Sequence, residues 1–145
     1  MSELIVMIGL PRAGKSTYVD HLNNYDIICA DDIRLAFGVQ FDPKIEPFVW
    51  AIHDTILRAK MLRKRNIVLD ETNTVLDRIN RSKTLVKEYD YDLKLVYIAT
   101  PLETCLQRNV GKGSVPKEVI YRMNEQLQEL LKTLPKFNYD LITVH

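Results

Sequence analysis

Short apolar runs alternate along this chain with longer segments in which apolar residues recur at helical spacing. The runs predict strands at 4–8, 25–30, 66–70, 93–99 and 139–144. The longer segments predict helices at about 15–23, 44–64, 76–88, 101–109 and 116–134. The run at 4–8 is apolar at every position and is followed by Gly9, which favours a strand buried on both faces. This alternation is typical of an α/β fold with a parallel sheet.

Composition places the chain among ordinary globular proteins. It has 145 residues, of which 46% are hydrophobic and 27% are charged. We find no repeat or linker, so a single domain over 1–145 is predicted. The 20 basic and 19 acidic residues leave a net charge of +1, whereas a protein that coats duplex DNA is usually more basic. A small site that grips one or two phosphates is compatible with this charge.

Membrane and disulfide signals are missing from the sequence. No apolar run approaches the ~20 residues that a membrane helix needs. The cysteines, Cys29 and Cys105, provide neither a disulfide framework nor a zinc site. We therefore expect a cytoplasmic protein with reduced thiols, no membrane contact and no disulfide-linked partner.

The segment 9–16 fits the phosphate-binding loop pattern G-x-x-x-x-G-K-[ST]. Glycines let the backbone wrap around phosphate oxygens, and the following helix adds its positive end. Lys15 is expected at the β- and γ-phosphates of ATP, the Ser16 hydroxyl on Mg²⁺ and Thr17 at the α-phosphate. The alternative is a chance glycine turn, but the predicted strand before it and helix after it favour a nucleotide site. The predicted nucleotide-binding residues are Gly9, Pro11, Arg12, Ala13, Gly14, Lys15, Ser16 and Thr17.

Asp70 ends the apolar strand predicted at 66–70, a layout typical of the carboxylate that orients Mg²⁺ beside a phosphate-binding loop. The predicted metal-binding residues are therefore Ser16 and Asp70. A helix cap or a solvated carboxylate at the end of a strand is the alternative for Asp70. The adjacent Glu71 is expected to point elsewhere and could fix an arginine on the acceptor side.

Asp31 and Arg34 follow the second predicted strand, at the sheet edge where ligands bind in parallel α/β folds. A kinase needs a base for the acceptor hydroxyl and a cation that holds the acceptor. The spacing i, i+3 could bring both side chains to one cleft once a helical turn begins. The alternative is that Asp31 or Asp32 caps a helix that begins near Ile33.

The motifs GLPRAGKST, ADDIR, LDETN and QRNVGKGSVP together resemble the kinase domain of 5′-polynucleotide kinases. The wider group of P-loop kinases includes RNA-ligase-associated and zeta-toxin-like kinases. The resemblance implies a three-layer P-loop NTPase fold, with a five-stranded parallel sheet in the order 2-3-1-4-5 and helices on both faces. It also implies that Asp31 is the general base, that Arg34 holds a phosphate of the acceptor, that Thr72 and Asn73 lie beneath the acceptor, and that Arg108 begins a lid over ATP.

The lid departs from the family pattern. The family carries an arginine shortly after its Arg-Asn pair, whereas the nearest cation here is Lys112, between Gly111 and Gly113. Lysine binds phosphate as a point charge without the fork of arginine. The catalytic lid cation is therefore expected to be either Arg108 or Lys112, in addition to Lys15, Asp31 and Arg34.

These observations predict an enzyme that uses ATP and Mg²⁺ to transfer the γ-phosphoryl group to a hydroxyl. The first acceptor is the 5′-hydroxyl of DNA or RNA. The alternative is a small-molecule kinase acting on a nucleoside, sugar or nucleotide-sugar, which the near-neutral charge favours mildly. A non-catalytic nucleotide-binding switch is a third reading, and Asp31 with Arg34 argues against it because a switch needs no hydroxyl base.

Two further features bear on the acceptor. Trp50 lies in the predicted helix at 44–64 and either stacks on a base or packs in the core. Three cations follow the Thr72-Asn73 pair, namely Arg78, Arg81 and Lys83. Their position would allow contact with nucleic acid, but the more common expectation is that they do not contact it.

Overall fold

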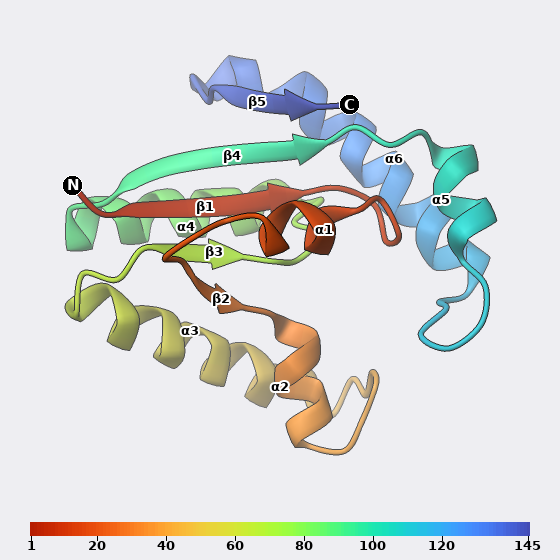
Figure 1. Ribbon diagram of the computed structural model, residues 1–145, viewed down its shortest axis with the longest axis horizontal. Coiled ribbons are helices and arrows are strands. Elements are labelled where there is room, and N and C mark those ends of the chain that lie inside the picture. The colour runs from red at the N-terminus through yellow and green to blue at the C-terminus, as the bar shows by residue number, and fades with distance from the viewer.

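The computed structural model describes residues 1–145 and has the alternating strands and helices that the sequence predicts (Figure 1). The strands are β1 (Glu3–Ile8), β2 (Asp26–Ile28), β3 (Ile67–Leu69), β4 (Asp92–Ile98) and β5 (Leu141–Val144). The helices are α1 (Lys15–Asp20), α2 (Ala30–Ala36), α3 (Glu46–Leu62), α4 (Leu76–Tyr89), α5 (Leu102–Arg108) and α6 (Lys117–Thr133), followed by the 3-10 turn η1 (Leu134–Phe137).

The strands form one five-stranded sheet in the order β2-β3-β1-β4-β5, and every neighbouring pair is parallel. The predicted strand order is therefore confirmed. In Figure 1, α1 lies in front of the sheet and α4 lies behind it, so helices cover both faces. Because all strands run the same way, their carboxyl ends meet at one edge, where α/β proteins bind ligands.

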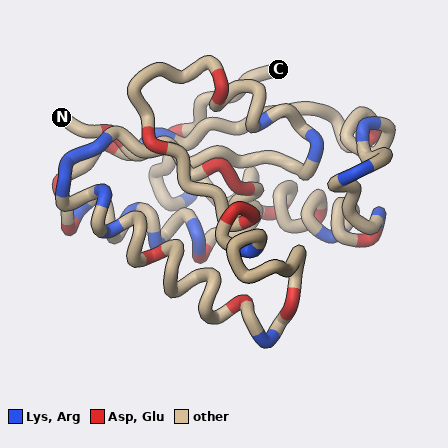
Figure 2. Tube along the Cα trace, turned by 60° about the horizontal axis from the view of Figure 1, so that its bottom comes forward, with Lys and Arg blue, Asp and Glu red and all other residues tan.

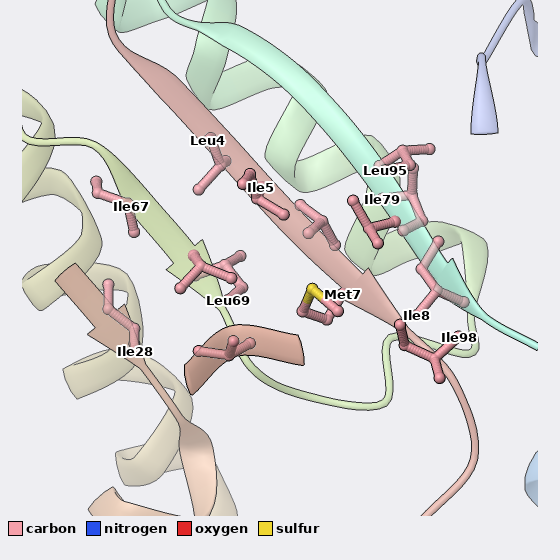
Figure 3. Close-up of a cluster of buried hydrophobic side chains, with 14 of the residues drawn as sticks. Leu4, Ile5, Met7, Ile8, Ile28, Ile67, Leu69, Ile79, Leu95 and Ile98 are labelled. Atoms are coloured by element: carbon pink, nitrogen blue, oxygen red, sulfur yellow. The ribbon is translucent and has the colours of Figure 1, made fainter. Parts of the chain in front are cut away.

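The core is centred on β1, in which Leu4, Ile5, Val6, Met7 and Ile8 are all at most 4% exposed. Figure 3 shows these side chains among those of the neighbouring strands and of α4. A strand between two parallel neighbours has both faces covered by the layers that flank the sheet. This burial explains why the run at 4–8 carries no polar residue.

The second strand and the helix after it differ from the expected boundaries. β2 ends at Ile28, and α2 begins at Ala30, three residues before the expected start near Ile33. Cys29 occupies the N-cap position and no side chain caps the helix, so the capping interpretation of Asp31 and Asp32 is wrong. Both carboxylates lie instead in the first turn, where they favour the helix through its positive end.

Charge is distributed without a strong bias of sign. Basic and acidic positions are intermixed along the trace in Figure 2. Lys60 and Arg65, from the end of α3 and the turn after it, both pair with Asp26, and these cations lower the pKa of that carboxyl to about 2. None of the helices combines the length and apolar character that crossing a membrane requires.

Leu95 of β4 is 2% exposed, and truncating it tests the role of the central sheet. Leu95→Ala should lower the free energy of unfolding by about 2–5 kcal/mol, because it removes buried methyl groups and leaves a cavity. Leu62→Ala is the matched control, since Leu62 is 72% exposed and its loss should change stability by no more than about 0.5 kcal/mol. Urea unfolding followed by circular dichroism measures both, and equal effects would contradict this account of the core.

Candidate functional site

The phosphate-binding loop joins β1 to α1 and is shaped by two glycines. Gly14 has a φ of 104°, a conformation that side chains rarely adopt. A Cβ on Gly9 would lie 3.3 Å from the carbonyl oxygen of Ile98, so the loop also passes close to the end of β4. The backbone conformation at Gly14 therefore favours glycine, and a side chain at Gly9 would crowd the end of β4, in agreement with the pattern G-x-x-x-x-G-K-[ST].

The side chain of Lys15 lies within this loop. Its Nζ donates hydrogen bonds to the carbonyl oxygens of Gly9 at 3.1 Å and of Leu10 at 2.6 Å. Burial lowers the pKa of the Lys15 amine to about 8, although the nearby Asp70 carboxylate acts in the opposite direction. The loop thus holds a cation that is poorly hydrated and bonded to neutral carbonyls, a state that an incoming phosphate would stabilise.

Ser16 and Asp70 meet although 54 positions separate them in the sequence. The Ser16 hydroxyl donates a hydrogen bond to Oδ2 of Asp70 at 2.9 Å. A hydroxyl and a carboxylate are oxygen ligands of the kind that Mg²⁺ prefers. The structure has no group of three His, Cys, Asp or Glu side chains that could hold a metal. Ser16 and Asp70 could thus supply two oxygen ligands to such an ion.

The segment after β3 is hydrogen-bonded to the start of the phosphate-binding loop and to β1. The Thr72 carbonyl accepts a hydrogen bond from the Gly9 amide at 3.1 Å. The buried Asn73 side chain donates from Nδ2 to the Met7 carbonyl at 2.8 Å, and its backbone has a φ of 47°. Asparagine tolerates this left-handed conformation better than most residues, which is the sequence signal for its structural role. The predicted acceptor contacts of Thr72 and Asn73 stay predictions.

The phosphate-binding loop opens into a cleft of about 830 Å³. The residues that line it come from the loop, α1, the ends of β4 and β5, and α5, and include Arg12, Lys15, Ser16, Thr17, Thr100 and Arg108. The Thr100 hydroxyl donates to the Ala13 carbonyl at 2.6 Å and ties the end of β4 to the loop. Sequence reasoning missed this contact because nothing local marks a threonine that is 87 positions from its partner.

Both expected lid cations lie near this cleft, but they contact it differently. Arg108 donates from Nη1 to the Arg12 carbonyl at 3.3 Å. Lys112 is exposed, and its backbone carbonyl accepts a hydrogen bond from the Arg12 side chain at 3.1 Å. Asn109 closes the lid segment by bonding both the amide and the carbonyl of Val115. Of the two cations, Arg108 has its side chain against the phosphate-binding loop.

On the acceptor side, Asp31 and Arg34 form an ion pair of 2.7 Å across one turn of α2. The Asp31 side chain is 79% exposed and the Arg34 side chain is 16% exposed. Arg34 also makes two hydrogen bonds to Glu46 of α3, which hold the guanidinium fork and raise its pKa. Sequence reasoning missed Glu46, since the pair joins two helices whose relative placement only the fold decides.

A second cavity, of about 270 Å³, lies between α3, α4 and the end of β3. Glu71, whose side chain is 9% exposed, forms its ion pair there with His53 and with no arginine, so the expectation that it could fix an acceptor-side arginine is not met. The Arg78 guanidinium carbon lies 3.2 Å from the centre of the Trp50 ring, which covers one face of the indole.

The other two cations of α4 lie elsewhere. Arg81 pairs with Asp54 at 2.7 Å on the wall of the second cavity. The Lys83 amine lies 4.7 Å from the centre of the Tyr139 ring, and Lys83 does not line that cavity.

Residues 4–131 match a family model described as an AAA domain. An L-seryl-tRNA(Sec) kinase of Methanococcus maripaludis is 30% identical over 132 residues, which are 85% of this chain and 51% of that protein. A protein of Autographa californica nuclear polyhedrosis virus, described as a bifunctional polynucleotide kinase/RNA ligase, is 24% identical over 127 residues, which are 77% of this chain and 18% of that protein.

Solved structures share the fold. A chain of the Pnkp1/Rnl/Hen1 RNA repair complex superposes with a TM-score of 0.79 and 24% identity, over 96% of this chain and 46% of that one. A second structure of a Pnkp1/Rnl/Hen1 complex gives a TM-score of 0.67 and 22% identity, over 79% of this chain and 41% of that one. The chain thus spans about half or less of the length of these relatives.

The lowered pKa of Lys15 predicts a pH dependence for ATP binding. Below about pH 8 the amine is charged and attracts phosphate, and above it the amine is neutral in the free protein. Affinity for ATP should therefore fall as the pH rises through about 8, by up to about tenfold per pH unit. Calorimetric titration over this range measures it. Lys15→Met should bind more weakly and without this dependence, and the same pH profile in both proteins would contradict the assignment.

Proposed function

The chain belongs to the AAA domain family, and on this premise we propose that it is a P-loop kinase that transfers the γ-phosphoryl group of ATP to the 5′-hydroxyl of DNA or RNA. The observation that supports this best is the meeting of Lys15, Ser16 and Asp70 at the edge of the sheet where Asp31 also lies. The similarity to the viral kinase/ligase supports a polynucleotide acceptor. In phosphoryl transfer of this kind, catalysis comes mainly from positioning the reacting groups and neutralising the charge on the phosphates.

The donor half of the proposed site is the phosphate-binding loop. Backbone amides and the N-terminal end of α1 would bind the phosphates of ATP, with Lys15 exchanging its carbonyl partners for phosphate oxygens. Ser16 and Asp70 would hold Mg²⁺, which supplies positive charge to the β- and γ-phosphates. Arg108, which lies against the loop and lines the same cleft, would add a second cation.

The acceptor half is the Asp31–Arg34 pair. The acceptor hydroxyl would give its proton to the Asp31 carboxylate while its oxygen forms a bond to the γ-phosphorus, and the bond from that phosphorus to ADP breaks. The high exposure of Asp31 supports this role, since an incoming hydroxyl can reach its carboxylate. Arg34 would bind a phosphate next to that hydroxyl by exchanging one of its carboxylate partners.

A small hydroxyl acceptor is the second candidate. The net charge of +1 gives little general attraction for nucleic acid. The relative from Methanococcus maripaludis is named for a seryl-tRNA acceptor, so a hydroxyl that does not end a polynucleotide is within the range of the similar proteins. The same donor machinery would serve either acceptor.

Transfer of label from radiolabelled ATP separates these candidates. The purified chain is incubated with Mg²⁺ and, in separate reactions, with 5′-hydroxyl oligonucleotides of DNA and RNA, nucleosides and sugars. Labelled oligonucleotides support the proposal, whereas label on nucleosides or sugars alone replaces it with the small-molecule alternative. ATP binding without transfer to any acceptor would favour a nucleotide-binding switch.

Replacing Asp31 tests the general base. Asp31→Asn keeps the size of the side chain and removes its ability to accept a proton, so kcat should fall by ~10²–10⁴. The dissociation constant of ATP should stay the same, because Asp31 does not line the nucleotide cleft. Asp32→Asn is the matched control, being the next residue in the same helical turn and also exposed. Loss of activity in Asp32→Asn with full activity in Asp31→Asn would show that Asp32 is the base.

The two lid cations are separated by single alanine variants. Arg108→Ala should lower kcat by about 10²–10³, the usual cost of one preorganised group that stabilises transition-state charge. Lys112→Ala should cost much less, because Lys112 contacts Arg12 through its backbone carbonyl, whereas the Arg108 side chain itself bonds the phosphate-binding loop. Steady-state kinetics on the best acceptor measures both, and the opposite order would assign the role to Lys112.

A further inference from the structure

The indole ring of Trp50 contacts two arginines that come from different helices. Arg34 of α2 lies 5.8 Å and Arg78 of α4 lies 3.2 Å from the centre of its ring, measured from the guanidinium carbons. A guanidinium over an indole face is held there by attraction between the cation and the π-system and by stacking. The indole therefore contacts both guanidinium groups, of which that of Arg34 also pairs with Asp31.

The two arginines differ in their charge partners. Arg34 donates to Glu46 through Nε and Nη2 and to Asp31 through Nη1. Arg78 makes no hydrogen bond and no ion pair, and the carboxylate of Glu71 in the same cavity pairs with His53. Burial lowers the pKa of the Arg78 guanidinium, which shows that the group has lost part of its hydration.

The charge of Arg78 is attracted by the carboxylates of Glu71, Glu46 and Asp77, but this attraction offsets its burial only in part, since its pKa stays lowered. The Trp50 ring contacts the Arg78 guanidinium, and no buried nitrogen of this group is without a partner, so its N–H groups, which make no hydrogen bond to the protein, are open to solvent or a ligand. Those groups form the planar fork that matches two oxygens of a phosphate. Arg78 lines the cavity of about 270 Å³, so a ligand can approach it.

The cavity adjoins the proposed reaction centre. Glu71 and Asn73 line it. In the segment after β3, Glu71 directly follows Asp70, the metal-binding candidate, and Asn73 directly follows Thr72. On its other side, Trp50 connects it to Arg34 and so to Asp31. An acceptor whose hydroxyl lies at Asp31 would therefore extend toward Arg78.

We propose that Arg78, held flat against Trp50, is a second phosphate-binding group for the acceptor, beside the phosphate that Arg34 is predicted to hold. The proposal rests on the proposed kinase function, and it names the acceptor class as a hydroxyl compound that carries a phosphate ester near that hydroxyl. It assigns Trp50 to positioning Arg78, instead of to stacking on a base.

A binding experiment tests this without any turnover. Trp50 is the one tryptophan of the chain, so its fluorescence reports directly on the contact with Arg78. A dinucleotide with a free 5′-hydroxyl and a 3′-phosphate, which carries two phosphates, should change the emission of Trp50 saturably in the absence of ATP. The nucleoside 3′-monophosphate, which offers only the phosphate predicted for Arg34, should require about 10- to 100-fold higher concentration. Arg78→Ala should abolish this preference, and Arg78→Lys should restore it in part because it keeps the charge but not the fork.

Lys83→Ala is the matched control. It removes one positive charge and one contact with an aromatic ring from the same helix, but Lys83 lies over Tyr139 and away from the cavity. Its preference for the dinucleotide should equal that of the unmodified protein. An equal preference in Arg78→Ala, or an equal loss in Lys83→Ala, would overturn the proposal. Urea unfolding of each variant confirms that the binding data come from folded protein.

Steady-state kinetics then separates this inference from the proposed reaction. Arg78→Ala should raise KM by about 10- to 100-fold for 5′-hydroxyl oligonucleotides, with a much smaller change in kcat and with KM for nucleosides unchanged. If oligonucleotides are phosphorylated with the same KM in both proteins, the role of Arg78 is wrong and the kinase function stands. If no acceptor is phosphorylated but Trp50 still detects the dinucleotide through Arg78, the anion site stands and the proposed reaction is wrong.

Discussion

The burial of β1 between β3 and β4 fixes the position of every group at the nucleotide edge. Because β1 is covered on both faces, its exit point at Gly9 cannot shift without disturbing the centre of the core. Parallel pairing then sets β3 beside it in one register, so that Asp70 emerges next to the loop and meets Ser16. The hydrogen bonds from Gly9 to Thr72 and from Asn73 to Met7 hold these two exits together.

Two cations at this edge are bonded to neutral carbonyl oxygens and not to carboxylates. Lys15 is bonded to carbonyl oxygens inside its own loop, and Arg108 is bonded to the loop from outside. Such contacts are weaker than those between a cation and an anionic oxygen, so phosphate can replace them at little cost. Arg34 is different, because Glu46 already satisfies much of its fork. Arg78 is the acceptor-side arginine whose N–H groups have no partner.

The overall charge of the chain favours recognition of individual phosphates by a few side chains over a general attraction for nucleic acid. The net charge is +1, and basic and acidic positions are intermixed along the trace (Figure 2). Binding of an acceptor would then depend on a few fixed guanidinium groups that recognise individual phosphates. Fixed groups lose little side-chain entropy on binding, since Trp50 and Glu46 have already restricted them.

The sequence by itself determined the sheet and the donor half of the site. A strand buried on both faces must be apolar at every position, and a loop around phosphate needs glycines and a lysine at fixed spacing, so both leave a local pattern that spans few residues. Tertiary structure alone decided the acceptor half. Glu46 with Arg34, Glu71 with His53, and Arg78 with Trp50 each join residues from different elements. Their pairing depends on how α2, α3 and α4 pack, and charged or aromatic residues can adopt several partners until packing brings one of them within reach.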